Sequence, residues 1–526
     1  MLGGQVTASD PPTTPRQVAL GLRDPSIEDI CDLAHGRACA VLDDDAALRA
    51  RLEQSRAMVD RALSEGRRVY GITTGYGASA RFEVEAAHAE VLPLHLLRYH
   101  GCGTGAALSE LESAAVVAVR AASLSRGYSG VRVELVERLL ELLRRRILPR
   151  IPEEGSVGAS GDLTPLSYLA AVVVGEREVL FEGEVRDASE VLGEVGLRPL
   201  RLRPKEGLAL MNGTAVMAAL GCLSWVRAER LGRLATLESA MACAVLDGVP
   251  GHFDERIFAL KPHAGPRAVA AAMRTSLEGS EFEPARVQDP YSLRCAPHVV
   301  GLLFDALPFT RSLLETEVLG VDDNPLLDPE TGRFLHGGNF YGGHVCLATD
   351  TLKNVCANVA DLLDRQLSLL NNPHTNAGLP ANLVAREGED RFTHHGFKAM
   401  EITASALTAE ALKLTMPASV FSRSTESHNQ DKVSMGAISA REARRVLELS
   451  ETVAVIHLLA LAQAMDLRGL ERFGPALLAV HSAVRERVAM NREDRRMDLD
   501  IARMLEALRA DELPLPRLES TPEAAR

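Results

Sequence analysis

Three long apolar stretches do most to constrain what this chain can fold into. Residues 214–248 are rich in Ala and Leu, and residues 344–371 and 440–467 repeat apolar side chains at helical spacing. In the second stretch the repeat consists of Leu352, Val355, Val359, Leu363, Leu367 and Leu370. Helices of about 30 residues are about 40 Å long, and apolar character on nearly all sides is typical of buried helices. The sequence therefore predicts a central bundle of long helices that other subunits help to cover.

The expected fold class is all-α, with the long-helix bundle as core and a smaller mixed N-terminal domain that precedes it. A chain of 526 residues is too long for one compact core of ordinary size. The expected parts are a loose leader (1–24), an N-terminal domain (25–204), the long-helix central bundle (205–513) and a loose tail (514–526). The leader is rich in Gly, Thr and Pro and lacks the apolar segment of a signal peptide.

Local signals place shorter elements within the N-terminal domain. Ser26 is a plausible helix cap, and residues 46–63 have helical spacing. Residues 178–187 predict a β-hairpin that turns at Gly183. The Gly-rich segment 69–77 predicts a loop, and its Gly-x-Gly spacing lacks the third glycine, the preceding strand and the downstream acid of a dinucleotide site. A dinucleotide cofactor is therefore not expected.

Composition narrows the possible functions further. The net charge of −13 argues against a nucleic-acid partner, and no uncharged run approaches the ~20 residues that a membrane helix needs. The eight cysteines show no C-x-x-C spacing, which argues against a zinc site and against a disulfide scaffold. We therefore expect a cytoplasmic protein that requires no metal and binds neither nucleic acid nor a membrane.

The segment Gly155–Tyr168 carries the strongest chemical signal in the chain. Gly161 has no side chain, so its backbone nitrogen can close onto the carbonyl carbon of Ala159, and Ser160 can then lose water. The product, a 4-methylidene-imidazol-5-one ring, would be an electrophile made of backbone atoms. Asp162 is expected to cap the helix that follows, which would place the electrophile near a helix N-terminus.

This segment resembles the cofactor-forming segment of the aromatic amino acid lyases, which include histidine, phenylalanine and tyrosine ammonia-lyases and the related 2,3-aminomutases. Four further segments resemble the same family in the same order, so the resemblance covers nearly the whole chain. It implies that the ring forms from Ala159, Ser160 and Gly161 and that no metal is needed. It also implies a homotetramer with shared active sites and a small-molecule aromatic amino acid as the substrate.

The resemblance also implies catalytic roles for residues in those segments. Tyr70 lies in the Gly-rich loop and matches the base that removes the β-proton. Asn212 would donate a hydrogen bond to the ring carbonyl, in the manner of an oxyanion hole. Tyr291 would position the electrophile, and Gln288 would line the site. Arg294 offers a planar fork that suits the substrate carboxylate.

The remaining matched positions concern the substrate ring. Phe340 would pack beside the electrophile, and Asn429 and Gln430 would line the site. Histidine ammonia-lyases carry Glu where this chain has Gln430, whereas the phenylalanine, tyrosine and aminomutase members carry Gln. Tyr99 and His100 occupy the pair that sets ring selectivity in the family, but Tyr-His matches none of the usual combinations.

The expected reaction is elimination of ammonia from an aromatic L-amino acid to give the α,β-unsaturated acid. Because Gln430 lacks the carboxylate that would bind an imidazole, a tyrosine or phenylalanine type of substrate is favoured. Histidine ammonia-lyase, which forms urocanate, and aromatic 2,3-aminomutase are the alternatives. A non-catalytic helical scaffold is a third hypothesis, from a different functional class, and the intact set of matched residues argues against it.

Overall fold

The computed structural model describes residues 16–518, which divide into two compact units. Unit 1 contains the chain up to Leu223 together with Leu314–Gly343 and Phe421–Ala437, and unit 2 contains Ser224–Leu313, His344–Val420 and the chain from Ile438 onward. This division differs from the contiguous domains expected from the sequence, because two loops between long helices fold with the N-terminal part of the chain. Residues 1–15 of the expected leader and 519–526 of the expected tail lie outside the described residues.

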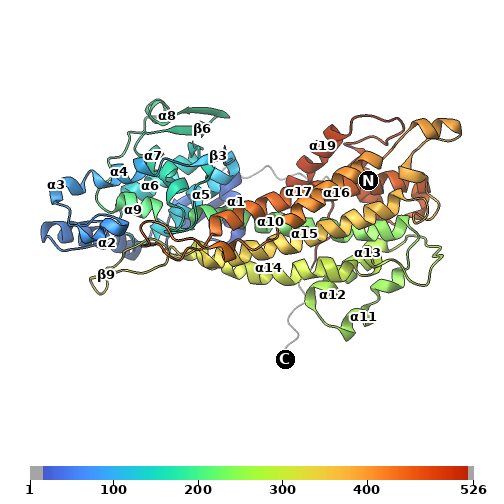
Figure 1. Ribbon diagram of the computed structural model, residues 1–526, viewed down its shortest axis with the longest axis horizontal. Coiled ribbons are helices and arrows are strands. Elements are labelled where there is room, and N and C mark those ends of the chain that lie inside the picture. Colours follow the sequence, from blue (N-terminus) through green and yellow to red (C-terminus); the bar gives the residue numbers. More distant parts are fainter. Residues whose placement is uncertain (1–15, 519–526) are drawn as a thin grey trace, which may run out of the picture. The chain divides into compact units, whose positions relative to one another are not determined.

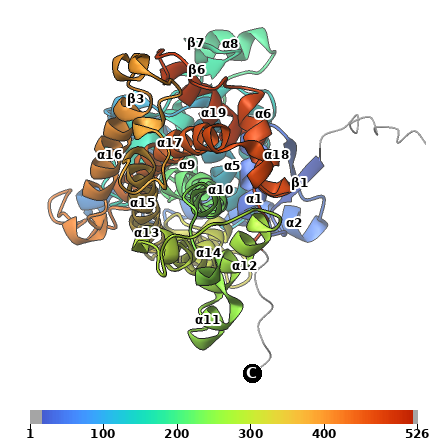
Figure 2. The same cartoon turned by 90° about the vertical axis from the view of Figure 1, so that its right-hand side faces the viewer.

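Unit 2 is built mainly from the greater part of the long helices α10 (Ala215–Val245), α14 (Ala296–Leu319), α15 (Gly343–Asn371) and α17 (Gly436–Arg468). Residues 215–223 of α10 and 314–319 of α14 belong to unit 1. Figures 1 and 2 show these helices side by side. Buried hydrogen bonds connect them: Gln366 Nε2 of α15 donates to Ser239 Oγ of α10 at 3.0 Å. The Trp225 indole of α10 donates to the carbonyl of Leu307 in α14 at 2.9 Å. The all-α class and the three long helices predicted from apolar repeats are confirmed.

Helix α14 was not among the predicted long helices. Pro308 lies inside it, and an internal proline removes a backbone donor and usually marks a helix end in sequence. Helix α17 is the one helix of the described chain that is long and apolar enough to cross a membrane, but 89% of its most apolar window is buried inside the protein. The shorter helices of unit 2 are α11 (Glu255–Leu260), α12 (Ala264–Leu277), α13 (Tyr291–Arg294), α16 (Lys398–Lys413), α18 (Pro475–Arg485) and α19 (Asp498–Arg509).

Unit 1 is organised around helix α5 (Glu110–Ser125), which is buried on nearly all sides. Helices α1 (Ile27–His35) and α6 (Val133–Arg144) pack against it. Capping boxes fix the starts of α1 and α5, and the predicted cap at Ser26 is confirmed. The remaining helices of this unit are α2 (Ala46–Ser64), as predicted, α3 (Ala86–Ala89), α4 (Leu92–Tyr99), α7 (Leu163–Val173), α8 (Ala188–Glu194) and α9 (Glu206–Met211).

Short strands complete unit 1. The predicted hairpin is confirmed as β6 (Glu178–Phe181) and β7 (Glu184–Asp187), with β4 (Leu148–Pro149) as a third strand. Strand β1 (Arg16–Leu20) pairs in parallel with β2 (Ala38–Leu42), although residues 1–24 were expected to be loose. The reason is burial, because Leu20 is fully enclosed. The other pairs are β3 (Thr104–Ala107) with β5 (Pro152–Glu154), and β8 (Leu326–Asp328) with β9 (Arg333–Leu335).

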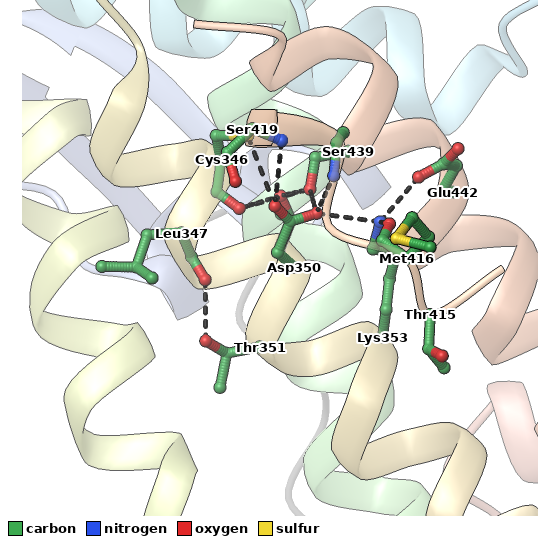
Figure 3. Close-up of polar contacts among 12 residues, drawn as sticks. Cys346, Leu347, Asp350, Thr351, Lys353, Thr415, Met416, Ser419, Ser439 and Glu442 are labelled. Atoms are coloured by element: carbon green, nitrogen blue, oxygen red, sulfur yellow. Dashed lines mark hydrogen bonds and ion pairs between the residues drawn. The ribbon is translucent and has the colours of Figure 1, made fainter. Parts of the chain in front are cut away.

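A buried polar cluster on α15 connects distant parts of unit 2 (Figure 3). Lys353 is fully buried, and its ammonium group pairs with Asp350 at 2.8 Å and with Glu442 at 2.6 Å. The same nitrogen donates to the carbonyl of Met416 at 2.9 Å. Each of these partners satisfies part of the hydrogen-bonding capacity of a charge that water cannot reach.

Asp350 makes the second set of contacts in this α15 cluster. Its carboxylate accepts from the backbone N–H of Ala418 at 3.0 Å and from Ser439 Oγ at 2.7 Å. The α15 cluster therefore holds the chain just before the segment Phe421–Ala437 and the chain just after it. Both ends of that segment are fixed by buried charges.

Lys353→Met should lower the free energy of unfolding by about 3–5 kcal/mol, because Asp350 would remain as a buried charge without its partner. Denaturant or thermal unfolding followed by circular dichroism measures this effect. Arg496→Gln is the matched control, since Arg496 pairs with Asp498 on the exposed surface and such pairs contribute only about 0–1 kcal/mol. Equal losses of unfolding free energy in the two variants would contradict the conclusion that the α15 cluster stabilises the fold.

Candidate active site

A pocket of about 400 Å³ in unit 1 brings together most of the predicted site residues. Those that line it are Tyr70, Ala159, Ser160, Asn212, Phe340, Asn429 and Gln430. They come from five separate parts of the chain: the Gly-rich loop, the loop before α7, the end of α9, and the segments Leu314–Gly343 and Phe421–Ala437. The convergence of these residues on one cavity makes it the candidate active site.

The Ala-Ser-Gly loop directly precedes helix α7 and depends on two glycines with positive φ. Gly158 has φ +71°, and a Cβ there would lie 2.2 Å from Ser434 Oγ. Gly161 also has φ +71°, and a Cβ there would lie 2.0 Å from the carbonyl oxygen of Gly213. Only glycine fits at such close approaches with this backbone conformation. Ser160 is therefore presented between two positions at which no side chain is possible.

Asp162 does not cap α7 as expected, since its side chain makes no capping hydrogen bond. Its carboxylate instead accepts from the backbone N–H of Met217 at 2.9 Å and from Ser156 Oγ at 3.2 Å. The reason is burial: Asp162 is fully buried, and its partner Met217 lies in the first turn of α10. Burial raises the pKa of the Asp162 carboxyl to about 7.

The peptide and hydroxyl groups of Ser160 are held by two amide side chains. Asn212 Nδ2 donates to the carbonyl oxygen of Ser160 at 2.8 Å. Gln430 Nε2 donates to Ser160 Oγ at 3.0 Å, and its Oε1 accepts from Thr425 Oγ1 at 3.0 Å. Asn212 is thus placed to stabilise negative charge on that carbonyl oxygen, and Gln430 lies against the hydroxyl rather than at a remote wall of the pocket.

Tyr70 lies on the Gly-rich loop, and its hydroxyl oxygen accepts a hydrogen bond from the backbone N–H of Gly77 at 3.0 Å. Its ring packs edge-on against Tyr76. Burial raises the pKa of Tyr70; the Gly77 N–H acts to lower it, and the negative charge of Glu426 raises it further. A tyrosine base needs a lowered pKa, so within unit 1 the surroundings of Tyr70 oppose the ionisation that the predicted role requires.

Tyr99 and His100 lie at the end of α4 and do not line the pocket. Their rings stack on each other with centroids 4.3 Å apart. Burial, together with the positive charge of Arg177, lowers the pKa of His100 to about 4, so its imidazole is neutral at pH 7. The predicted ring-selectivity pair is therefore placed beside the site, with the two rings in contact with each other.

Gln288, Tyr291 and Arg294 belong to unit 2, whereas the pocket is lined by unit 1 alone. Tyr291 is 72% exposed, and the Arg294 guanidinium lies over its ring at 4.5 Å from the centroid. Arg294 Nε also donates to the carbonyl of Asp289 at 3.0 Å. Tyr291 and Arg294 thus contact each other on α13, outside the lining of the pocket.

Sequence reasoning missed four polar residues that line the pocket: Asn324, His336, Asp431 and Lys432. Asp431 and Lys432 directly follow Gln430, and His336 precedes the Gly-Gly-Asn-Phe motif, so each could have been found by extending a motif already chosen. Asn324 Oδ1 accepts from the backbone N–H of Gly337 at 2.9 Å, which ties two pocket-lining loops together. His336 and Lys432 give the pocket basic groups that the predicted set lacked.

The chain matches the family model for aromatic amino acid lyase over residues 26–486. The chain belongs to the aromatic amino acid lyase family. It is 40% identical to histidine ammonia-lyase of Symbiobacterium thermophilum over 470 residues, which cover 89% of this chain and 92% of that relative. Among solved structures it is similar to tyrosine aminomutase from Streptomyces globisporus, with a TM-score of 0.88 and 34% identity over 94% of this chain and 97% of the other. Histidine ammonia-lyase from Trypanosoma cruzi gives a TM-score of 0.87 and 33% identity, with coverage of 95% and 96%.

This aromatic amino acid lyase is therefore a carbon–nitrogen lyase, and the resemblance found in its sequence is confirmed. The family uses a methylidene-imidazolone group. The residues present fit such a group: Gly161 has no side chain to hinder closure of its backbone nitrogen onto Ala159, Ser160 lines the pocket, and Asn212 donates to the Ser160 carbonyl oxygen, which the ring would retain.

Glu426→Gln should move the pH dependence of kcat/KM in this lyase to lower pH. Tyr70, the predicted base, acts only after losing its proton, and the charge of Glu426 raises its pKa. Removal of that charge lowers the pKa of Tyr70, so activity should rise at a lower pH. Profiles of ammonia release against pH measure the shift.

The matched control for this test is Glu184→Gln, at an exposed position on β7. This substitution also removes one carboxylate charge, but at a position distant from Tyr70 in sequence. The pH profile of the control should therefore match that of the unmodified enzyme. A Glu426→Gln profile that coincides with the control would contradict an electrostatic effect of Glu426 on the base.

Proposed function

We propose that this chain eliminates ammonia from an aromatic L-amino acid, with histidine as the preferred substrate and urocanate as the product. The observation that carries this proposal is the pocket in which Tyr70, Ser160, Asn212 and Gln430 meet, in a chain with 40% identity over 89% of its length to a protein named histidine ammonia-lyase. Other curated relatives at 36–41% identity bear the same name. A cytoplasmic location is part of the proposal.

The proposed cofactor is 4-methylidene-imidazol-5-one formed from Ala159, Ser160 and Gly161, without any metal. When formed, it supplies an electrophile that makes the substrate amine a better leaving group. Asn212 would hold the Ser160 carbonyl oxygen through the 2.8 Å hydrogen bond and stabilise negative charge there. Phe340, which lines the same pocket, would pack beside the ring.

Tyr70 is the proposed base for the β-proton. The N–H of Gly77, 3.0 Å from its hydroxyl oxygen, would stabilise the phenolate, but burial opposes it. The base therefore needs a further positive or donor group once substrate is bound. Lys432 and His336 line the same pocket and are the candidates within unit 1.

The proposed assembly is a homotetramer with shared active sites. Arg294 would bind the substrate carboxylate, Tyr291 would position the electrophile and Gln288 would line the site, each acting in the pocket of another subunit. The exposed Tyr291 side chain and the absence of these residues from the lining of the described pocket motivate this arrangement.

A tyrosine type of substrate is the second candidate, and Gln430 is the observation that favours it. A glutamine amide has no charge with which to bind an imidazolium, whereas it can donate to or accept from a ring hydroxyl. However, a glutamine can also pair with a neutral imidazole, which has one donor and one acceptor. His100 and Tyr99 do not line the pocket, and the names of the relatives support histidine.

The intact protein should weigh about two waters less than its sequence, because ring closure releases one water and dehydration of Ser160 releases the other. Ser160→Ala has no hydroxyl to lose as water, so it should weigh at most one water less than its own sequence, and it should lose nearly all activity, since removal of a covalent catalytic group typically costs several orders of magnitude. Intact-mass spectrometry and ammonia release measure the two effects. Chelators should leave activity unchanged. Full activity in Ser160→Ala would contradict the cofactor assignment.

A panel of histidine, tyrosine and phenylalanine should give the highest kcat/KM for histidine. Gln430→Glu should raise the preference for histidine over tyrosine by about tenfold, because charge-assisted hydrogen bonds are about twice as strong as neutral ones. Gln54→Glu, which adds the same charge at an exposed position of α2, is the matched control and should leave the ratio unchanged. A higher kcat/KM for tyrosine supports the second candidate, and a β-amino acid product identifies an aminomutase.

A further inference from the structure

Behind Asn212 lies a layer of buried charges to which the proposed reaction assigns no role. Asp322 and Asp323 are adjacent in sequence, and both are at least 95% buried. Asp322 pairs with Arg120 of α5 at 2.7 Å, and Asp323 pairs with Lys205, which directly precedes α9. All four side chains belong to unit 1. Two ion pairs without access to water are a costly way to stabilise a fold, so their placement calls for an explanation.

The Asp323–Lys205 pair fixes the N-terminal end of α9. Lys205 has φ +78°, a conformation that side-chain-bearing residues rarely adopt. Its ammonium group is bound by Asp323, whose other oxygen accepts from Ser129 Oγ at 2.9 Å. The unusual backbone conformation directly before α9 is therefore held in place by the contact of the Lys205 side chain with Asp323.

The Asp322–Arg120 pair fixes the C-terminal end of α9, where Asn212 lies. Arg120 Nη2 donates to the carbonyl of Ala209 at 2.5 Å, three residues before Asn212. Asp322 Oδ2 accepts from the backbone N–H of Thr214 at 2.7 Å, two residues after it. The turn that carries Asn212 is therefore held on both sides by the two members of one ion pair.

Gly213 shows how closely the turn and the ion pair approach each other. A Cβ at Gly213 would lie 2.1 Å from Arg120 Nη1 and 2.6 Å from Asp322 Oδ2. The carbonyl oxygen of Gly213 also accepts from the backbone N–H of Asp162 at 2.7 Å. Asp162 is the residue directly after the Ala-Ser-Gly loop. A movement of the ion pair would thus move the turn, and the turn contacts the loop directly.

We infer that Asp322 is a positioning residue that aims the Asn212 amide at the carbonyl oxygen of Ser160. This inference rests on the proposed function, in which that hydrogen bond stabilises charge. Hydrogen bonds weaken steeply with poor geometry, and stabilisation of developing charge requires donors that are fixed in advance. Asn212 lies between the six-residue helix α9 and Gly213, and these two do not by themselves hold an amide rigidly. Asp322 and Arg120 supply that rigidity.

The experiment is a double-mutant cycle of Asp322→Asn and Asn212→Ala in the full-length enzyme, with kcat, KM, melting temperature and the intact-mass loss of two waters as readouts. Asp322→Asn keeps the size of the side chain and one acceptor but removes the charge that holds Arg120. Ser123→Ala is the matched control, because Ser123 Oγ also donates to Asp322, at 2.7 Å, on the oxygen Oδ1, whereas the backbone N–H of Thr214 donates to Oδ2.

Asp322→Asn should lower kcat by about tenfold or more, while KM changes by less than about threefold. A larger fraction of the variant protein than of the unmodified protein should also lack the mass loss of two waters. In the Asn212→Ala background the same substitution should change kcat and water loss by less than about twofold, because residues that act through one another are not additive. Ser123→Ala should lower the melting temperature alone. The inference would be overturned if the effects of Asp322→Asn and Asn212→Ala were additive in both kcat and water loss. It would also be overturned if Asp322→Asn, like Ser123→Ala, lowered the melting temperature alone.

If Asp322→Asn does not fold, the paired variant Arg120→Met/Asp322→Leu removes both charges and leaves neither one buried alone, a change that is often tolerated. Wild-type kcat and complete water loss in that variant would also overturn the inference. An unmodified protein that retains both waters or releases no ammonia refutes the proposed function itself, before any variant is compared. The two failures are therefore distinguishable.

Discussion

Two glycines meet where the loop before α7 passes the turn between α9 and α10, and the site depends on that contact. A Cβ on Gly161 would lie 2.0 Å from the Gly213 carbonyl oxygen, and the backbone N–H of Asp162 donates to the same oxygen at 2.7 Å. Because neither glycine has a side chain, the two backbones approach closely enough for Asn212 to reach the Ser160 carbonyl. The catalytic geometry is thus set by backbone contact first and by side chains second.

Much of the fold could be predicted from the sequence, because its signals are local. The long helices follow from apolar repeats that persist for many turns, and the β6–β7 hairpin follows from Gly183 between short strand-like runs. Helix α14 was missed because Pro308 interrupts the pattern, although the helix continues through this exposed residue with Leu303, Leu307 and Leu314 buried on its other side. Strand β1 was missed because its burial depends on pairing with β2, which sequence spacing cannot reveal.

The site was predictable where a motif carries its own chemistry, as with Ser160 and Asn212. It was not predictable where electrostatics depend on distant groups. Asp162 looked like a helix cap, yet a helix that starts elsewhere, α10, supplies its partner Met217. The raised pKa of Tyr70 depends on burial and on Glu426, which lies more than three hundred residues away in sequence. Such effects require the tertiary structure, because charge and desolvation act through space rather than along the chain.

The α15 cluster has a consequence for how this enzyme can change over time. Within unit 2, Lys353 and Asp350 bind the chain just before and just after the segment Phe421–Ala437, so the segment behaves as a loop closed at its base. Closing a longer loop costs little, about 0.6 kcal/mol for each doubling of length. Residues of this segment that line the pocket, such as Asn429 and Gln430, can therefore be exchanged while the helix bundle keeps its packing, and the lining can change without the fold having to be rebuilt.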